Sequence, residues 1–160
     1  MNLGNKINER LRELGSDVVC DQLPRDLPEY SVLKGKKIVI VDDLLRVAER
    51  LLPELMVATG GTADAVIQGQ DMTMGGILRQ VMDIKPDYVL MDRNLIRVRG
   101  ADVVTYLSMR RPDIKCIGFS SENGFEKEFK EAGAIASVLK RPESPEECIK
   151  DLAKVLKKIG

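Results

Sequence analysis

The sequence predicts an α/β domain in which a five-stranded parallel sheet is covered by helices on both faces. Two observations indicate this class. Short, continuous apolar runs recur from Lys36 onward, and segments with helical apolar spacing separate them. Such runs are typical of strands buried on both faces of a sheet. Parallel strands also need a long crossover, usually a helix, between them, which is the alternation that the sequence shows.

The predicted strands and helices alternate in order along the chain. The first strand is the run KIVIV at 37–41, which is β-branched, continuous and too short for a helix. The five predicted strands are 37–41, 63–67, 88–91, 114–119 and 135–139. The five predicted helices are 44–56, 76–84, 103–109, 125–132 and 145–158.

Local signals mark the ends of several predicted helices. Pro86 and Pro112 each follow a helical stretch that a proline cannot continue. Gly133 can adopt the left-handed conformation that ends the fourth helix. The sequence SPEE at 144–147 predicts a capping box, with Pro145 at the first position of the last helix.

The first 35 residues differ from the rest of the chain. Leu3, Ile7, Leu11 and Leu14 form one apolar stripe of a short helix that Gly15 can end. The residues up to position 35 then show no periodicity. We therefore divide the chain into an N-terminal helix with a linker or arm, 1–35, and an α/β domain, 36–160. Two interpretations of 1–35 stay open: an arm packed on the domain, or a helix that docks a partner and could mediate a homodimer.

Composition and charge exclude several classes of function. The 160 residues contain 25 Lys and Arg, 25 Asp and Glu, three cysteines and no histidine. Zero net charge gives no reason to expect direct nucleic-acid binding, and the absence of histidine excludes Ser-His-Asp and Cys-His catalysis. Three widely spaced cysteines form neither a disulfide framework nor a metal motif. No signal sequence or membrane span is recognisable, so we expect a cytoplasmic protein with no membrane insertion.

Charged or hydroxyl-bearing residues follow four of the five predicted strands. Asp42 and Asp43 end the first strand, Asp92 the third, Ser120 the fourth and Lys140 the fifth. Ligands of parallel sheets bind at this edge. Converging carboxylates repel one another, and a Mg²⁺ ion with oxygen ligands removes that repulsion. A lysine and a hydroxyl opposite them would hold phosphoryl oxygens. The pattern therefore predicts Mg²⁺-dependent phosphoryl transfer at a carboxylate.

Four motifs around these residues resemble the receiver domain of two-component response regulators and are similar to the single-domain chemotaxis regulator. They are KIVIVDD (37–43), YVLMDRNL (88–95), CIGFSSE (116–122) and GAIASVLKRP (133–142). The resemblance extends over about 36–158. It implies a receiver domain at 36–160 whose parallel sheet has the flavodoxin-like strand order 2-1-3-4-5.

The resemblance also assigns roles to individual residues. It implies that Asp92 is the phosphoacceptor, with Lys140 and Ser120 binding the phosphoryl group. Asp42, Asp43 and Asp92 would hold Mg²⁺ together with the backbone carbonyl of Asn94. Asn94 and Glu122 would tune hydrolysis of the acyl phosphate.

Further implications concern partners and activity. The phosphoryl donor would be a sensor histidine kinase or a phosphotransfer protein, because this chain has no histidine to phosphorylate. With no second domain expected after Gly160, we expect a stand-alone regulator that signals to a downstream protein target. It would catalyse only its own phosphorylation and dephosphorylation, so it is not expected to be an enzyme with an external substrate.

Four positions depart from the usual receiver pattern. Ser137 stands where the family usually has an aromatic residue, and Arg141 is inserted between Lys140 and the following proline. Ile96 stands where a proline is usual, and Arg99 where an acid is frequent. The departures raise the question of whether switching follows the usual route.

Two alternatives to a phosphorylated receiver follow from the same residues. One is a degenerate receiver that keeps the pocket and acts as a phosphorylation-independent interaction module. The other is a phosphoribosyltransferase-like enzyme, in which Asp42 and Asp43 would bind ribose hydroxyls and the TGGT sequence, Thr59–Thr62, would bind a phosphate. In that family the two halves are almost adjacent, whereas here 44–58 intervene.

Overall fold

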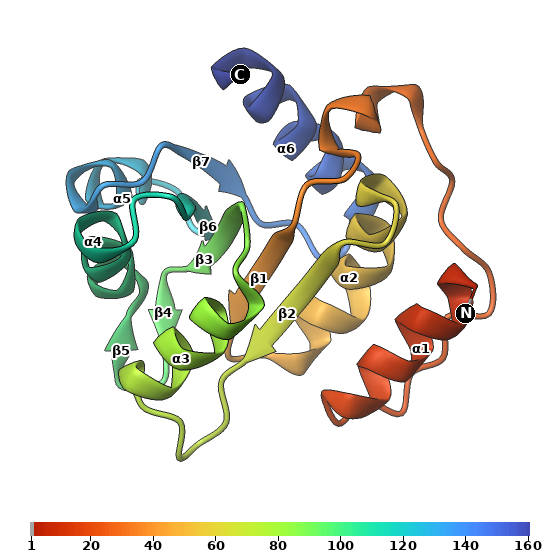
Figure 1. Ribbon diagram of the computed structural model, residues 1–160, viewed down its shortest axis with the longest axis horizontal. Helices are drawn as coiled ribbons and strands as arrows, with labels where there is room; N and C mark the ends of the chain where they lie inside the picture. The colour runs from red at the N-terminus through yellow and green to blue at the C-terminus, as the bar shows by residue number, and fades with distance from the viewer. Residues whose placement is uncertain (1) are drawn as a thin grey trace.

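The computed structural model describes residues 2–160 and contains the predicted parallel sheet (Figure 1). Its strands are β1 (Ile38–Asp42), β2 (Ala63–Ile67), β3 (Tyr88–Asp92), β6 (Lys115–Ser120) and β7 (Ala136–Leu139). They lie in the order β2-β1-β3-β6-β7, and each neighbouring pair is parallel. Counted among these five strands, this is the predicted order 2-1-3-4-5, which is confirmed.

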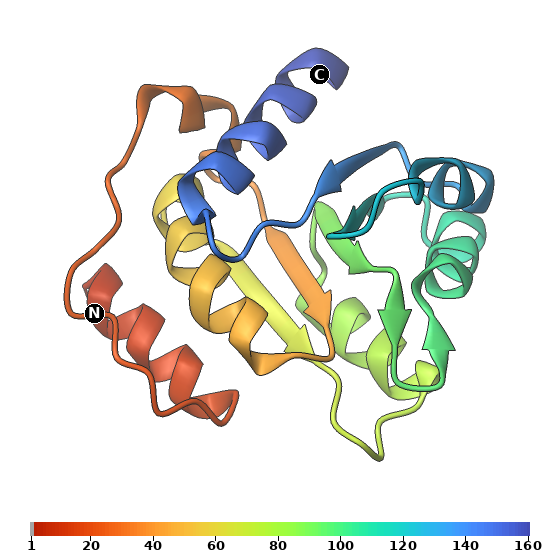
Figure 2. The ribbon, with the colours of Figure 1, turned by 180° about the vertical axis from the view of Figure 1, so that it is seen from behind.

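Helices cover both faces of the sheet, as predicted. They are α2 (Leu45–Thr59), α3 (Met74–Ile84), α4 (Gly100–Arg110), α5 (Glu126–Ala132) and α6 (Pro145–Ile159). Ile38 and Ile40 of β1 pack in one core cluster with α2 and α6 (Figure 2). Val39 and Val41 point to the opposite face and pack with α3, α4 and α5. The alternation of β1 side chains between two apolar layers explains why its sequence is apolar without interruption.

The N-terminal residues pack against α2 and α6. Helix α1 (Leu3–Glu13) contacts α2, and its Ile7 and Leu11 are fully buried. A short 3₁₀ helix, η1 (Pro28–Leu33), contacts both α6 and α2 and buries Tyr30. Figure 2 shows this segment wrapped around the outer side of α2. Of the two interpretations of the N-terminal segment, the structure therefore shows the first, an arm packed on the domain.

The predicted capping box at the start of α6 is wrong. The Ser144 side chain makes no capping hydrogen bond, because its backbone (φ −134°, ψ 68°) is not in the extended conformation typical of an N-cap. Glu147 instead lies 3.7 Å from the Lys150 ammonium. Pro145 does occupy the start of the helix, as predicted.

A two-stranded hairpin that the sequence patterns did not predict separates β3 from α4. It pairs β4 (Asn94–Leu95) with β5 (Val98–Arg99) in antiparallel register. At its tip Arg97 has a positive φ of 55°. At its base the Gly100 N–H donates to the Arg93 carbonyl at 2.9 Å. The hairpin therefore carries the chain away from Asp92 and back again.

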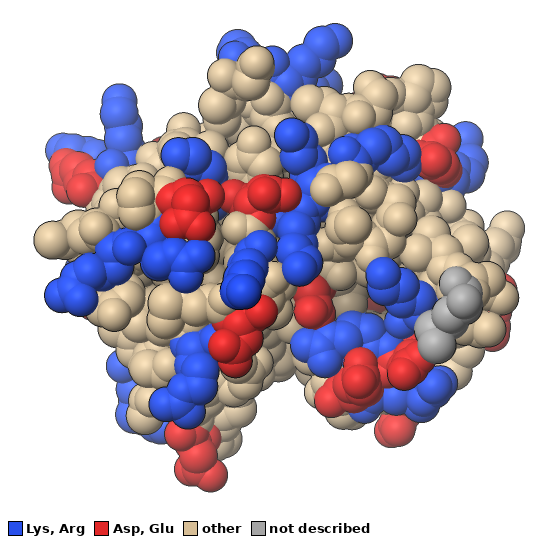
Figure 3. Space-filling model, viewed as in Figure 1, with Lys and Arg blue, Asp and Glu red and all other residues tan. Residues whose placement is uncertain are grey.

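The surface carries charges of both signs without a separate basic or acidic face in the view of Figure 3, where Lys and Arg alternate with Asp and Glu. Within residues 2–160, no helix combines the length and apolar character that crossing a membrane requires.

Candidate functional site

The parallel register brings the predicted acidic residues to one edge of the sheet. Asp42 ends β1 and Asp92 ends β3, and these strands are direct neighbours. Lys140 follows β7, two strands further along. Its ammonium donates to Asp42 Oδ2 at 2.7 Å and to Asp92 Oδ1 at 2.8 Å. Asp42, Asp92 and Lys140 are 0%, 6% and 8% exposed, so the three charges interact with little screening by water.

The oxygen atoms at this edge are suited to a hard divalent cation. Asp42, Asp43 and Asp92 each offer a carboxylate oxygen, and these oxygens lie within 4.8 Å of one another. Asp43 is half-buried and faces solvent more than the other two. Three carboxylates face a single ammonium, which leaves excess negative charge at the site. Carboxylate oxygens are the ligands that the hard Mg²⁺ ion prefers, and it keeps several waters beside them, so this set of residues fits Mg²⁺.

Burial and mutual repulsion perturb the acids at this edge. Burial, followed by the neighbouring Asp42 carboxylate, raises the pKa of Asp92 from 3.8 to about 6, against the opposing effect of Lys140. Burial also raises the pKa of Asp42, which Lys140 partly counteracts. Burial disfavours the ammonium of Lys140, but the two carboxylates outweigh it and raise its pKa. Lys140 therefore stays positively charged at neutral pH.

Ser120 lies at the same edge, at the end of β6, and is 3% exposed. Its hydroxyl oxygen accepts the backbone N–H of Glu122 at 3.2 Å. The Glu122 carboxylate accepts from the Asn94 side-chain amide at 3.5 Å, so the two predicted hydrolysis-tuning residues lie side by side. Both are exposed. The structure thus gathers at one edge all the residues that the sequence singled out there.

Arg93 is a site neighbour that the sequence analysis did not identify. Its guanidinium donates to Glu122 at 3.1 Å and to Glu128 of α5 at 2.9 Å. These two contacts connect the start of the loop after Asp92 to the loop after Ser120 and to α5. The sequence contains no signal for this arrangement, since the partners are 29 and 35 positions away.

The departures from the receiver pattern have defined surroundings. Ser137 is a half-buried residue of the edge strand β7. The inserted Arg141 donates to the Asp151 carboxylate of α6. The residue after Lys140 is therefore attached to the adjacent helix.

The phosphoribosyltransferase-like arrangement is not present among residues 2–160. Helix α2 separates the acidic pair from Thr59–Thr62 and leads the chain back to the start of β2 at the other edge of the sheet. The amides of Gly60 and Gly61 already donate to the carbonyls of Val57 and Met56 in the helix cap. They are therefore not free to bind a phosphate, and the sequence TGGT is a helix-ending turn.

Solved structures with a similar fold include response regulators. A receiver domain protein from Methanospirillum hungatei JF-1 is 25% identical, with a TM-score of 0.58 over 78% of this chain and 98% of that chain. The chemotaxis response regulator CheY4 of Vibrio cholerae is 20% identical, with a TM-score of 0.60 over 75% and 98%. The response regulator TrrA of Thermotoga maritima, solved with Mg²⁺ and BeF, is 19% identical, with a TM-score of 0.59 over 75% and 98%.

Sequence comparison alone gives no assignment, since no family model and no curated protein matches the chain. The structural comparison identifies the fold of the chain. The chain has the fold of response regulator receiver domains, among whose solved examples is a chemotaxis regulator.

Proposed function

We propose that the protein is a receiver module of two-component signalling that accepts a phosphoryl group from a phosphohistidine onto Asp92. The observation that carries this proposal is the position of Lys140, whose ammonium bridges Asp42 and Asp92 beside the third carboxylate, Asp43. One buried edge thus combines a nucleophile, a cation for the phosphoryl oxygens and carboxylates for a metal. The fold, shared with response regulators, supports the same conclusion.

The proposed reaction is an in-line transfer between two proteins. A carboxylate oxygen of Asp92 attacks the phosphorus, a P–O bond forms, and the P–N bond to the partner's imidazole breaks. The imidazole leaves with the electron pair of that bond and takes up a proton. Attack requires the ionised form of Asp92, which predominates above its pKa of about 6.

The surrounding residues would bind the transferred group. Asp42, Asp43 and Asp92, with the backbone carbonyl of Asn94, would hold Mg²⁺, which when bound neutralises charge on the phosphoryl oxygens. Lys140 exchanges a carboxylate partner for a phosphoryl oxygen. The Ser120 hydroxyl turns from the Glu122 N–H toward the new phosphoryl group.

The lifetime of the acyl phosphate would depend on Asn94 and Glu122. Their side chains lie 3.5 Å apart, next to the acceptor residue and the switch hydroxyl. In this position they would control the approach of the hydrolytic water. The phosphorylated state would be read by a downstream protein, and the donor would be a sensor histidine kinase or a phosphotransfer protein.

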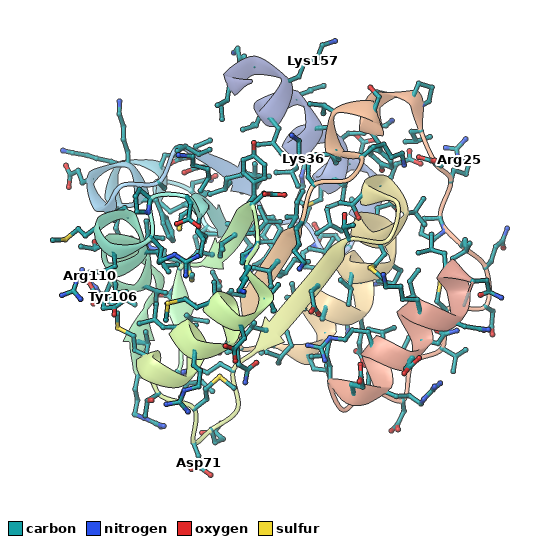
Figure 4. All side chains as sticks on the ribbon, in the orientation of Figure 1. Arg25, Lys36, Asp71, Tyr106, Arg110 and Lys157 are labelled. Atoms are coloured by element: carbon teal, nitrogen blue, oxygen red, sulfur yellow. The ribbon has the colours of Figure 1, made fainter. Side chains whose placement is uncertain are left out.

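Phosphorylation by a small-molecule donor tests this proposal. The full chain is incubated with Mg²⁺ and acetyl phosphate, and its intact mass is measured for one added phosphoryl group. Asp92→Asn should abolish the addition. Asp71→Asn is the matched control, since Asp71 is an exposed acid in the loop after β2 (Figure 4) and should not affect it.

Beryllofluoride binding provides the second measurement, because this anion occupies a phosphoryl site without chemical transfer. Uptake by the native protein but not by Asp92→Asn supports the proposal. Absence of both phosphoryl and beryllofluoride uptake would refute it and favour the phosphorylation-independent interaction module.

A further inference from the structure

Gln68 has a buried side chain that connects two loops at the edge of the sheet where the acids lie. It follows β2 directly and is 2% exposed. Its backbone N–H donates to the Asp42 carbonyl at 2.8 Å. Its side-chain amide donates to the carbonyls of Ile96 at 2.9 Å and Met72 at 3.0 Å. Its side-chain oxygen accepts the Ile96 N–H at 2.6 Å. Both donors and the acceptor of this amide are therefore used.

The contact with Ile96 holds the tip of the β4–β5 hairpin. Ile96 and Arg97 form the turn between the two short strands, and Gln68 binds both backbone groups of Ile96. The Arg97 guanidinium also donates to the backbone carbonyl of Gln70, in the same loop as Gln68. Strands of two residues are marginal without other contacts. Bonds from the loop after β2 therefore fix where this hairpin lies.

Ile96 is suited to this contact because it has a backbone N–H. The receiver pattern that the sequence resembles usually has a proline at this position, and a proline has no N–H to donate. The departure at Ile96 and the buried amide of Gln68 thus belong together. In this chain the Ile96 N–H donates to the buried Gln68 side chain, a bond that a proline at this position could not make.

From this arrangement we infer that Gln68 is a positioning residue for the metal centre, although it touches neither metal nor phosphoryl group. The hairpin it anchors begins with Asn94, whose carbonyl is the one backbone ligand of the proposed site. A backbone ligand is oriented only by the segment that carries it, so loss of the anchor should weaken metal binding. The inference rests on the proposed function, because it presupposes a Mg²⁺ ion at Asp42, Asp43 and Asp92.

Calorimetric Mg²⁺ titration of the full chain tests this inference. Gln68→Ala should raise the Mg²⁺ dissociation constant about tenfold, the lower range for loss of an outer contact at a metal site. Gln70→Ala is the matched control, since Gln70 is exposed and contributes its backbone carbonyl to Arg97. The free energy of unfolding is measured in EDTA for each variant, so that a change in metal affinity is separated from a change in stability.

Ile96→Pro removes one of the hydrogen bonds that Gln68 makes, the bond from the Ile96 N–H to Gln68 Oε1, and serves as the second variant if Gln68→Ala folds poorly. It should weaken Mg²⁺ binding in the native background and have little further effect together with Gln68→Ala. A native protein that binds no Mg²⁺ refutes the proposed function, and this inference with it. The inference alone is overturned if the native protein binds Mg²⁺ and both Gln68→Ala and Ile96→Pro bind it as tightly as Gln70→Ala does. A loss of stability without a change in Mg²⁺ affinity overturns it as well.

Discussion

Gly100 lies directly against the backbone of Asp92. A Cβ atom built on Gly100 would stand 1.8 Å from the Asp92 carbonyl oxygen and 3.1 Å from Cγ of Met91. No side chain can be accommodated there unless β3 and the start of α4 separate. The residue at position 100 therefore determines how closely the chain returns to the proposed phosphoacceptor.

Gly100→Ala should lower both stability and phosphoryl uptake. We expect a loss of about 1–3 kcal/mol in the free energy of unfolding, as for overpacked sites, together with slower labelling by acetyl phosphate. Gly75→Ala in α3 is the matched control, because the nearest atom to its Cβ would be Thr73 Oγ1 at 3.6 Å. That variant should label like the native protein. If acetyl phosphate labelled Gly100→Ala as fast as the native protein, the contact between Gly100 and Asp92 would not position Asp92.

Asp92→Asn should stabilise the metal-free protein at neutral pH. The pKa of Asp92 is about 6 in the folded protein and 3.8 ordinarily, so ionisation of the folded form is disfavoured. Ionisation of Asp92 therefore lowers the free energy of unfolding by about 3 kcal/mol, because each pH unit between the two pKa values contributes about 1.4 kcal/mol. This penalty is complete above about pH 6 and disappears below about pH 4.

Denaturant unfolding in EDTA at several pH values checks this expectation. Asp92→Asn should exceed the native protein in stability at pH 7.5, and the difference should shrink as the pH falls from about 6 to about 4. Asp71→Asn should show no comparable difference, since Asp71 is exposed. A constant difference across this pH range would contradict the assigned cause.

The sheet and most of the site could be predicted because both follow from continuous patterns. The strands are uninterrupted apolar runs, and parallel strands place their carboxyl ends at one edge. Asp42, Asp92, Ser120 and Lys140 each follow such a run, so their convergence needed no long-range information. The arm was harder, since the stripe on residues 3–14 predicts a buried face without saying what covers it.

The remaining features depend on contacts that no local pattern records. The β4–β5 hairpin consists of two-residue strands, too short to show a period. Gln68 is a single polar residue after a strand, and only the fold shows that Ile96 meets it. Arg93 binds acids of a distant loop and helix for the same reason. At Ser144 the error is the opposite one, because the sequence contains a capping motif that the structure does not use. The backbone conformation of Ser144 does not allow its side chain to make the capping hydrogen bond.

Lys140 is expected to hold the metal-free site together. Removing its ammonium leaves Asp42 and Asp92 buried beside each other without a counter-charge, so Lys140→Met should lower the free energy of unfolding by about 3 kcal/mol. Mg²⁺ should recover part of this loss, because the cation supplies positive charge to the same carboxylates.

The control for Lys140 is Lys157→Met, since Lys157 is exposed near the end of α6 (Figure 4). Thermal unfolding with and without Mg²⁺ compares the two variants. Equal stability of Lys140→Met and Lys157→Met in EDTA would contradict the view that the buried ammonium compensates the two acids.

Tyr30 is expected to make the N-terminal arm part of the cooperative folding unit. Its hydroxyl donates to the buried Glu54 carboxylate of α2 at 2.7 Å. Burial raises the pKa of Glu54, with the Tyr30 hydrogen bond opposing that shift. Tyr30→Phe removes the donor and leaves a buried acceptor unpaired, which should cost about 1–3 kcal/mol of unfolding free energy.

Tyr106→Phe is the matched control, because the half-buried Tyr106 ring keeps its contact with Arg110 on the far side of the sheet, as the labels in Figure 4 show. Chemical unfolding should show one transition that shifts only in Tyr30→Phe, while acetyl phosphate labels both variants equally. A separate early transition for the arm, with an unchanged main transition, would mean that residues 2–35 unfold independently of the sheet.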